Sequence, residues 1–214
     1  MGPMHLLGIL ALASAAAIGG RWYLRRFDSL GRPRAFPWIS VVGLVVIGVA
    51  AIVPWFLRMR LEARLAAAAS TFVGEDVEVN CQSFGEAFVD PRAEFGYVAF
   101  GPDGVPEKET LIKRDQCRDL KAYLDSDKVA PSAAQIVAVH TLTHEAIHMT
   151  GVTSESKTEC LAIHRDAEMA QLLGAPRGAA EDLAALYWEI HFPSLPPEYT
   201  SDCPSPNDAA PPSI

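Results

Sequence analysis

The feature that most limits the fold of this chain is the long uncharged run from Ala35 to Leu57. A helix of about 20 apolar residues spans the hydrocarbon core of a bilayer, and this run is at least that long. Trp38 and Trp55 stand near its two ends, and aromatic side chains favour the membrane interface. The run therefore predicts a transmembrane helix over about residues 36–57.

A second apolar run, from Met4 to Gly20, precedes the first and holds no Lys, Arg, Asp or Glu. Its length is near the lower limit for a span. A cleaved signal peptide is the alternative, because the small residues from Ala15 to Ala17 resemble a cleavage site. Signal peptides carry a basic segment before the apolar one, and none precedes this run. We therefore expect a span over about residues 4–20.

Basic residues are concentrated around these two runs. Residues 1–64 hold eight of the 18 Lys and Arg but only two of the 26 Asp and Glu, so the rest of the chain is acidic. An acidic body would repel phosphates, which argues against nucleic-acid binding. Five arginines lie in the loop over residues 21–34, and three follow the second run. The positive-inside rule then predicts a multi-pass protein of the cell membrane, with a cytoplasmic loop and an extracytoplasmic body.

Four cysteines, Cys81, Cys117, Cys160 and Cys203, all lie after the predicted spans and form no CxxC pair. An even number at wide spacing is typical of disulfides in an oxidising compartment. Pairing by proximity along the chain would join Cys81 with Cys117 and Cys160 with Cys203. The alternative is a set of unpaired, buried thiols.

The body over residues 71–191 is predicted to be an α+β domain that follows a membrane anchor over residues 1–64. Apolar and polar residues alternate around Val77 and Val79, which indicates a strand. The segments GYVAF and ETLIKR flank a GPDG turn, as the two strands of a hairpin do. We therefore expect a short antiparallel sheet. Residues 82–95 are ambiguous.

Helical patterns occupy most of the remaining chain. Start and stop signals predict one helix over 131–151, one from Thr153 or Ser154 to Gly174, and one from Pro176 to about residue 190. Two further segments, 58–70 and 115–127, are also consistent with helix. Residues 192–214 contain seven prolines and are predicted to be an extended or disordered tail.

The predicted helix over 131–151 contains the motif HExxH, from His144 to His148. Histidines four residues apart lie on one helix face and can bind one ion together. Glu145 stands beside that ion, where its carboxylate can take a proton from a bound water. The motif predicts a zinc site with His144 and His148 as ligands and Glu145 as the catalytic base. A helical HExxH without metal is the alternative.

A catalytic zinc ion usually has three protein ligands and one open position. Glu155 and Glu159 follow the motif and share a face of the next predicted helix. One of them can bind the metal while the other hydrogen-bonds a ligand histidine.

The HExxH motif followed by Ser154-Glu155-x-x-Thr158-Glu159 resembles the zincin metallopeptidases, and among them the gluzincins, whose third ligand is a glutamate. Thermolysin-like members carry Asn-Glu-x-x-Ser-Asp on the second helix, where the glutamate binds zinc and the aspartate bonds a zinc histidine. The resemblance covers about residues 140–160 and implies that Glu155 is the ligand and Glu159 the hydrogen-bonding acid. Glu159 stays an alternative ligand, because Glu155 follows the motif sooner than in those enzymes. The order HExxH, Gly, ExxTEC also resembles that of small bacterial membrane proteins.

These features predict a membrane-anchored zinc metallopeptidase that hydrolyses peptide bonds with metal-activated water and the general base Glu145. Its partner would be a peptide or protein substrate. Zincins bind substrate as an extended strand along a sheet edge, for which GYVAF is the candidate. The alternative function is a catalytically silent, zinc-stabilised binding module at the membrane.

Further residues could contribute to such a site, although each is more often structural. His140 lies one turn before His144 and could line the site or hydrogen-bond a ligand, but a packed helix residue is the commoner case. His164, His191 and Tyr187 are candidates to stabilise negative charge on the substrate oxygen. The sequence does not choose among them.

The topology can be tested with a reporter that is active only outside the cytoplasm, fused after Ile214. We expect an active reporter, because the arginine-rich loop should stay inside and both flanking segments outside. Fusion of the same reporter within the loop, after Gly31, is the control and should be inactive. The opposite pattern would reverse the predicted orientation.

Overall fold

The computed structural model describes residues 3–83, 95–200 and 203–206. The chain divides into two compact units, Met1–Arg60 and Leu61–Ile214, which are described separately. The division lies close to residue 64, the predicted end of the anchor.

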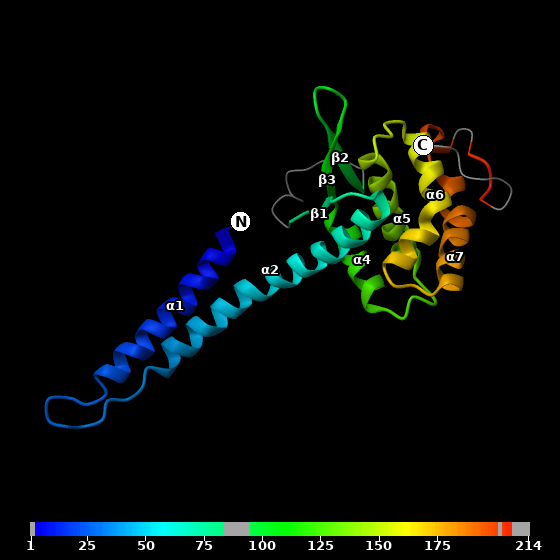
Figure 1. Ribbon diagram of the computed structural model, residues 1–214. Coiled ribbons are helices and arrows are strands. Elements are labelled where there is room, and N and C mark those ends of the chain that lie inside the picture. Colours follow the sequence, from blue (N-terminus) through cyan, green and yellow to red (C-terminus); the bar gives the residue numbers. More distant parts are fainter. Residues whose placement is uncertain (1–2, 84–94, 201–202, 207–214) are drawn as a thin grey trace. The chain divides into compact units, whose positions relative to one another are not determined.

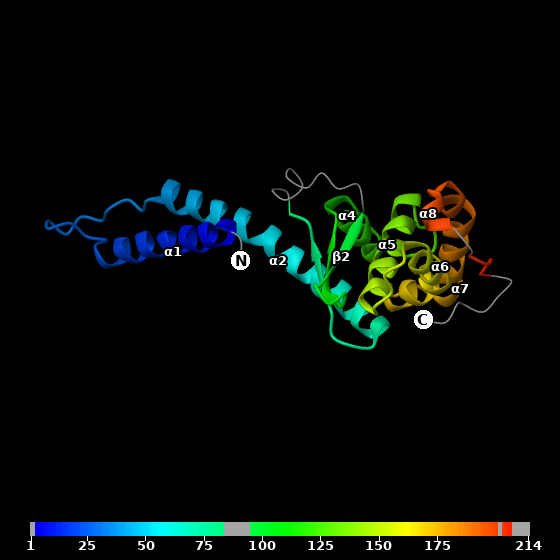
Figure 2. The same cartoon turned by 90° about the horizontal axis from the view of Figure 1, so that it is seen from above.

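The first unit consists of helix α1 (Pro3–Leu24) and the first part of helix α2 (Trp38–Val73). Both helices are long and apolar enough to cross a membrane, and they lie side by side (Figures 1 and 2). Gly8 and Gly48 mark a close approach, because a Cβ atom added at Gly8 would lie 3.1 Å from the carbonyl oxygen of Gly48. Small residues let apolar helices pack at such short range.

Helix α2 continues beyond its uncharged run, as the sequence predicted, and its last turns belong to the second unit. Leu65, Ala69 and Phe72 are buried there in a single apolar core. The same helix therefore provides an apolar segment in the first unit and core side chains in the second.

The second unit contains a three-stranded sheet of β1 (Glu78–Cys81), β2 (Gly96–Phe100) and β3 (Pro106–Ile112), in the order β1-β3-β2. The predicted hairpin is confirmed, because β2 and β3 pair in antiparallel fashion across the GPDG turn. The prediction of a purely antiparallel sheet was wrong, because β1 pairs with β3 in parallel. Turn signals reveal antiparallel neighbours, whereas a parallel pair joins strands that are distant in the chain. Of the ambiguous residues 82–95, residues 84–94 lie outside the described part of the chain.

The longer helices that follow the sheet are α4 (Arg114–Asp125), α5 (Ala133–Met149), α6 (Glu155–Leu172) and α7 (Arg177–Leu186). The sheet, α5, α6 and α7 follow one another in this order in both views (Figures 1 and 2). Helix α5 packs on α4, α6 and the sheet, and from Ala138 to Met149 every residue is buried. Polar side chains on this helix therefore need partners inside the protein.

The predicted boundaries of α5 and α6 are confirmed. Ser132 caps α5 in a capping box with Gln135, so two backbone N–H groups at this helix end are satisfied. Gly151 follows the helix with φ of 106°, a left-handed conformation that glycine adopts without strain. Ser154 caps α6, and Gly174 follows that helix with φ of 98°.

Both disulfides pair as predicted, Cys81 with Cys117 and Cys160 with Cys203. The first joins β1 to α4, and the second joins α6 to the C-terminal segment. Unpaired thiols, the alternative, are excluded for all four cysteines.

The third predicted helix continues beyond α7 as a π-helical turn, η1 (Tyr187–His191). The predicted extended or disordered tail, residues 192–214, instead begins with a 3-10 turn, η2 (Phe192–Ser194), and a short helix, α8 (Pro197–Thr200). Residues 201–202 and 207–214 of this tail lie outside the described residues. Phe192 is buried in the core, and α8 packs on α6. Apolar side chains and the tether at Cys203 order this proline-rich stretch, which composition alone did not indicate.

Leu120 tests the core, because its side chain is completely buried on α4. The variant Leu120→Ala should lower the free energy of unfolding by about 2–5 kcal/mol, since it leaves a cavity. Urea denaturation of the full chain in detergent measures this change. Leu172→Ala is the matched control, because Leu172 is 37% exposed, and it should change stability by less than about 1 kcal/mol. Equal losses in the two variants would contradict the described core.

Candidate metal centre

Three side chains from two helices meet at one point in the second unit. Nε2 of His144 lies 3.1 Å from Nε2 of His148 and 3.1 Å from Oε2 of Glu155. The third separation, from Nε2 of His148 to Oε2 of Glu155, is 3.5 Å. Ligand atoms about 2.0–2.1 Å from a zinc ion, at tetrahedral angles, lie about 3.3 Å apart. His144, His148 and Glu155 could therefore hold one metal ion.

The turn between α5 and α6 brings Glu155 back to the histidines. His144 and His148 lie one turn apart on α5, and Gly151 then reverses the chain with its left-handed backbone. Helix α6 begins at Glu155, directly after its cap Ser154. The carboxylate thus lies at the N-terminus of a helix, where the helix dipole favours negative charge.

Both histidines are held through the ring nitrogen that faces away from this meeting point. Nδ1 of His148 lies 2.7 Å from the carbonyl oxygen of Val152, to which its N–H donates. Nδ1 of His144 lies 3.0 Å from Oε2 of Glu159. In the neutral form of each ring, a proton on Nδ1 leaves a lone pair on Nε2 that can bind an ion.

Glu159 occupies a different position from Glu155, with only 2% of its surface exposed. Its Oε2 lies 3.0 Å from ring nitrogens of both His140 and His144, and its Oε1 accepts a hydrogen bond from the hydroxyl of Tyr187 at 2.9 Å. This arrangement favours Glu155 as the third ligand and Glu159 as the acid that bonds a ligand histidine. His140, His144 and Glu159 are also close enough together to share an ion, so the alternative stays open.

Glu145 is buried beside the two candidate ligand histidines and, like them, lines a cavity next to β2. Strand β2 passes close to it, because a Cβ atom added at Gly96 would lie 2.9 Å from Oε1 of Glu145. Any larger residue at this position would displace the carboxylate or the strand. The glycine backbone of β2 therefore helps to fix the candidate base.

The charges of this cluster are coupled. Hydrogen bonds from His144 and His148 lower the pKa of Glu155 to about 2. Burial disfavours the charged form of His144, but its hydrogen bonds to Glu155 and Glu159 outweigh this and raise its pKa to about 9. Metal ligands must be deprotonated, so an ion at this site would displace protons. Metal binding is therefore expected to weaken as the pH falls.

His140 is buried, as expected for a packed helix residue, but it is also part of the hydrogen-bonded cluster. Burial disfavours its charge, yet the carboxylates of Asp166 and Glu159 attract the proton and raise the pKa of His140 to about 10. An imidazolium therefore lies among buried carboxylates one helical turn from His144.

A cavity of about 930 Å³ opens over the candidate ligands. All residues of β2 line it, including side chains from both faces of the sheet, which indicates that the cavity follows the edge of this strand. Among the described strands, β2 pairs only with β3 and lies at one end of the strand order. Leu195, Pro196 and Tyr199 of the C-terminal segment also line the cavity.

Of the three candidates for stabilising a substrate oxygen, only Tyr187 lines this cavity. Its hydroxyl is engaged with Glu159. His164 lies instead beside the Cys160–Cys203 disulfide, where its Nε2 is 3.2 Å from the carbonyl oxygen of Pro204. His191 lies in η1 and is absent from the described lining.

Sequence reasoning missed two residues of this region. Asp166 is fully buried and lies 2.8 Å from Nδ1 of His140. It follows Glu159 by seven residues, and this helical spacing could have identified it. The ring centroid of Tyr199 lies 6.3 Å from that of His144. No sequence motif indicated this position, because it depends on the path of the C-terminal segment.

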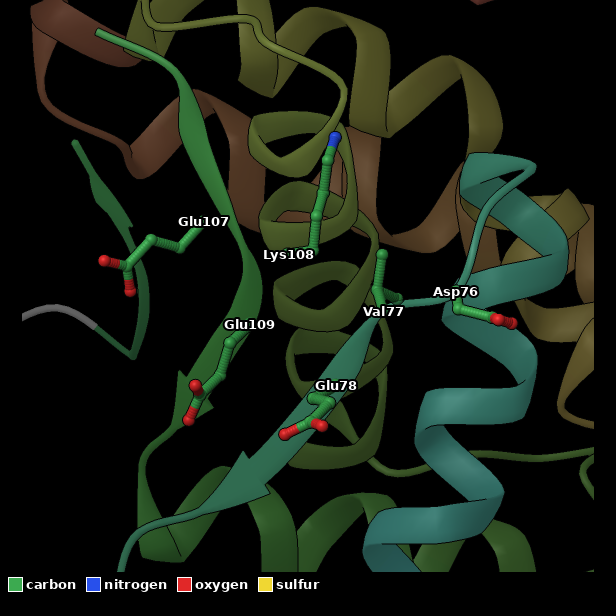
Figure 3. A pocket seen from close by; sticks show the side chains of 6 residues that line it. All are labelled: Asp76, Val77, Glu78, Glu107, Lys108 and Glu109. Carbon is green, nitrogen blue, oxygen red and sulfur yellow. The ribbon is translucent and has the colours of Figure 1, made fainter. Parts of the chain in front are cut away.

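A second hollow, of about 470 Å³, lies at the surface along β1 and β3. Figure 3 shows carboxylates on both strands, with Glu78 on β1 and Glu109 on β3, which are register partners. The ammonium of Lys108 is engaged with Glu75 and with the carbonyl oxygen of Met149. The described lining contains no histidine, so this acidic hollow lacks the donor set of the cavity over α5.

Comparisons with protein-family models, with curated proteins and with solved structures find no match to this chain. The chemistry of the site therefore has to be inferred from its own geometry.

Substitution of the candidate ligands tests the site through metal content after dialysis against Zn²⁺. The pair His144→Ala and His148→Ala should abolish binding, because it removes both ring nitrogens from the meeting point. Glu155→Gln should weaken zinc binding more than Glu159→Gln, for which we expect a loss of about 10–100-fold as for other partners of ligand histidines. The reverse order would make Glu159 the ligand. Unchanged metal content in the double histidine variant would contradict the site.

Proposed function

We propose that this chain is a membrane-anchored zinc metallopeptidase of the HExxH, gluzincin-like type, with its second unit outside the cytoplasm. The observation that carries the proposal is the meeting of His144, His148 and Glu155 within 3.1–3.5 Å, with Glu145 buried next to them. A site that only stabilises a fold has no need of a carboxylate at that position.

The donor set supports zinc as the ion. Two imidazole nitrogens and one carboxylate oxygen match the ligands of many catalytic zinc sites, which keep a fourth position open for water or substrate. Bound there, zinc would polarise the substrate carbonyl and lower the pKa of water towards about 7. The cavity above the three side chains leaves room for both groups.

Glu145 is the proposed general base. Its carboxylate accepts the proton of the attacking water and later delivers it to the leaving amine. Burial at 5% exposure keeps bulk water from competing for this proton, and the backbone of Gly96 limits the movement of the carboxylate. Proton transfer by a positioned side chain of this kind contributes about 10²–10⁴-fold to a rate.

Strand β2 is the proposed substrate platform. A peptide in extended conformation can add to a strand at the end of a sheet through backbone hydrogen bonds, while its side chains fill neighbouring pockets. The cavity follows β2 along its length and reaches Glu145 and the candidate ligands. A polypeptide bound there would lie across the candidate metal position.

The location is supported by two independent features. Two apolar helices are long enough to anchor the chain in a membrane. Disulfides form and persist in oxidising compartments. The two disulfides of the second unit therefore agree with a location outside the cytoplasm.

Glu145→Gln separates the proposed peptidase from a silent binding module. The purified full chain, loaded with Zn²⁺, is incubated with a mixed peptide library, and new amine groups are counted. The wild type should cleave the peptides, and Glu145→Gln should be slower by about 10²–10⁴-fold because no base remains, with its zinc content unchanged.

Glu181→Gln is the matched control, because Glu181 lies in an exposed ion pair on α7, and it should cleave at the wild-type rate. Equal cleavage by the wild type and Glu145→Gln would contradict the proposed base. Zinc binding without any cleavage would favour the binding module.

A further inference from the structure

The histidines of α5 and the acids of α6 form more contacts than a three-ligand metal site requires. Beyond the meeting point, Glu159 lies between His144 and His140, with Oε2 3.0 Å from a nitrogen of each. His140 in turn lies 2.8 Å from Oδ2 of Asp166. Nitrogen and oxygen atoms thus alternate from the candidate ligand His144 down to Asp166.

We infer that His140 and Asp166 are positioning residues of the metal centre, which act by holding Glu159 against Nδ1 of His144. The inference rests on the proposed metal site and deepens it. Neither residue reaches the meeting point of the ligands, so neither is proposed as a ligand or as a catalytic group.

Counting donors and acceptors supports this role. An ionised carboxylate only accepts hydrogen bonds, so Oε2 of Glu159 needs a proton on each of the two nitrogens beside it. His140 therefore donates to Glu159 from Nε2 and to Asp166 from Nδ1. In the same way, His144 must carry its proton on Nδ1, and this leaves Nε2 for an ion.

The charges lead to the same assignment. Glu159 and Asp166 are both buried, and two buried carboxylates without a partner of opposite charge would lower the stability of the fold. His140 lies between them, with one ring nitrogen 2.8 Å from Asp166 and the other 3.0 Å from Glu159. It therefore ties the two acids together, and a carboxylate that accepts the Nδ1–H of a ligand histidine orients that ring and makes it a stronger metal ligand.

Packing alone does not explain Asp166. Its side chain is completely buried, and among the described residues its Oδ1 has no hydrogen-bond partner. Such an oxygen lowers stability, and an apolar residue would serve packing better. Tyr187 further restrains the cluster, because its ring stacks on that of His140 at 3.6 Å between centroids while its hydroxyl bonds Glu159.

The test measures zinc affinity of the full chain by competition with a chromophoric chelator. Asp166→Asn and His140→Gln keep the size of each side chain approximately but remove its charge, and each should weaken zinc binding by about 10–100-fold. The visible absorption of the Co²⁺-loaded protein should also shift, because the orientation of His144 changes. Asp182→Asn and His164→Gln, on the exposed face of α7 and beside the disulfide, are matched controls that should bind as the wild type does.

A double-variant cycle tests whether Asp166 acts through Glu159. In a Glu159→Gln background, Asp166→Asn should have little further effect on zinc affinity, because the residue that it holds has lost its charge. Additive losses in the cycle would overturn the inference. Wild-type zinc affinity in the folded variants would also overturn it. Failure of both Asp166→Asn and His140→Gln to fold would do the same, because either result would assign these residues to packing. Absence of zinc binding in the wild type would instead refute the proposed function.

Discussion

The second unit depends on the pairing of an imidazole stripe on α5 with a carboxylate stripe on α6. His140, His144 and His148 repeat every four residues on one helix, and Glu155 and Glu159 repeat in the same way on the next. Because the connection at Gly151 is short, the end of α5 lies next to the start of α6, and the two rows of side chains come into contact there. Ion pairs and apolar packing therefore hold the same helix interface together.

This interface sets an energetic constraint on the domain. Helix α5 is surrounded by protein, so each charged or polar group on it must find a partner or lower the stability of the fold. The histidines of α5 find their carboxylate partners on α6. The two Nε2 atoms and the Glu155 oxygen that meet there are left to share protons or an ion. A divalent cation at that point would offset the carboxylates and would then stabilise both the site and the core around it.

Local signals made much of this domain predictable. Ser132, Gly151 and Ser154 marked the helix ends, the HExxH spacing indicated the histidine pair, and proximity along the chain indicated both disulfides. The parallel pairing of β1 with β3 was not predictable, because it joins distant segments without a turn to reveal it. The place of Tyr199 beside the cavity was missed for the same reason, since it depends on long-range packing.

The disulfide between Cys160 and Cys203 has a consequence for the order of biosynthesis. Leu195, Pro196 and Tyr199 line the cavity, yet they are synthesised after every other residue that lines it. The nearby tether closes only when Cys203 has left the ribosome and met an oxidant. A nascent chain therefore exposes the histidine cluster with one wall missing until this segment has been translated, and the disulfide then ties the segment covalently to α6.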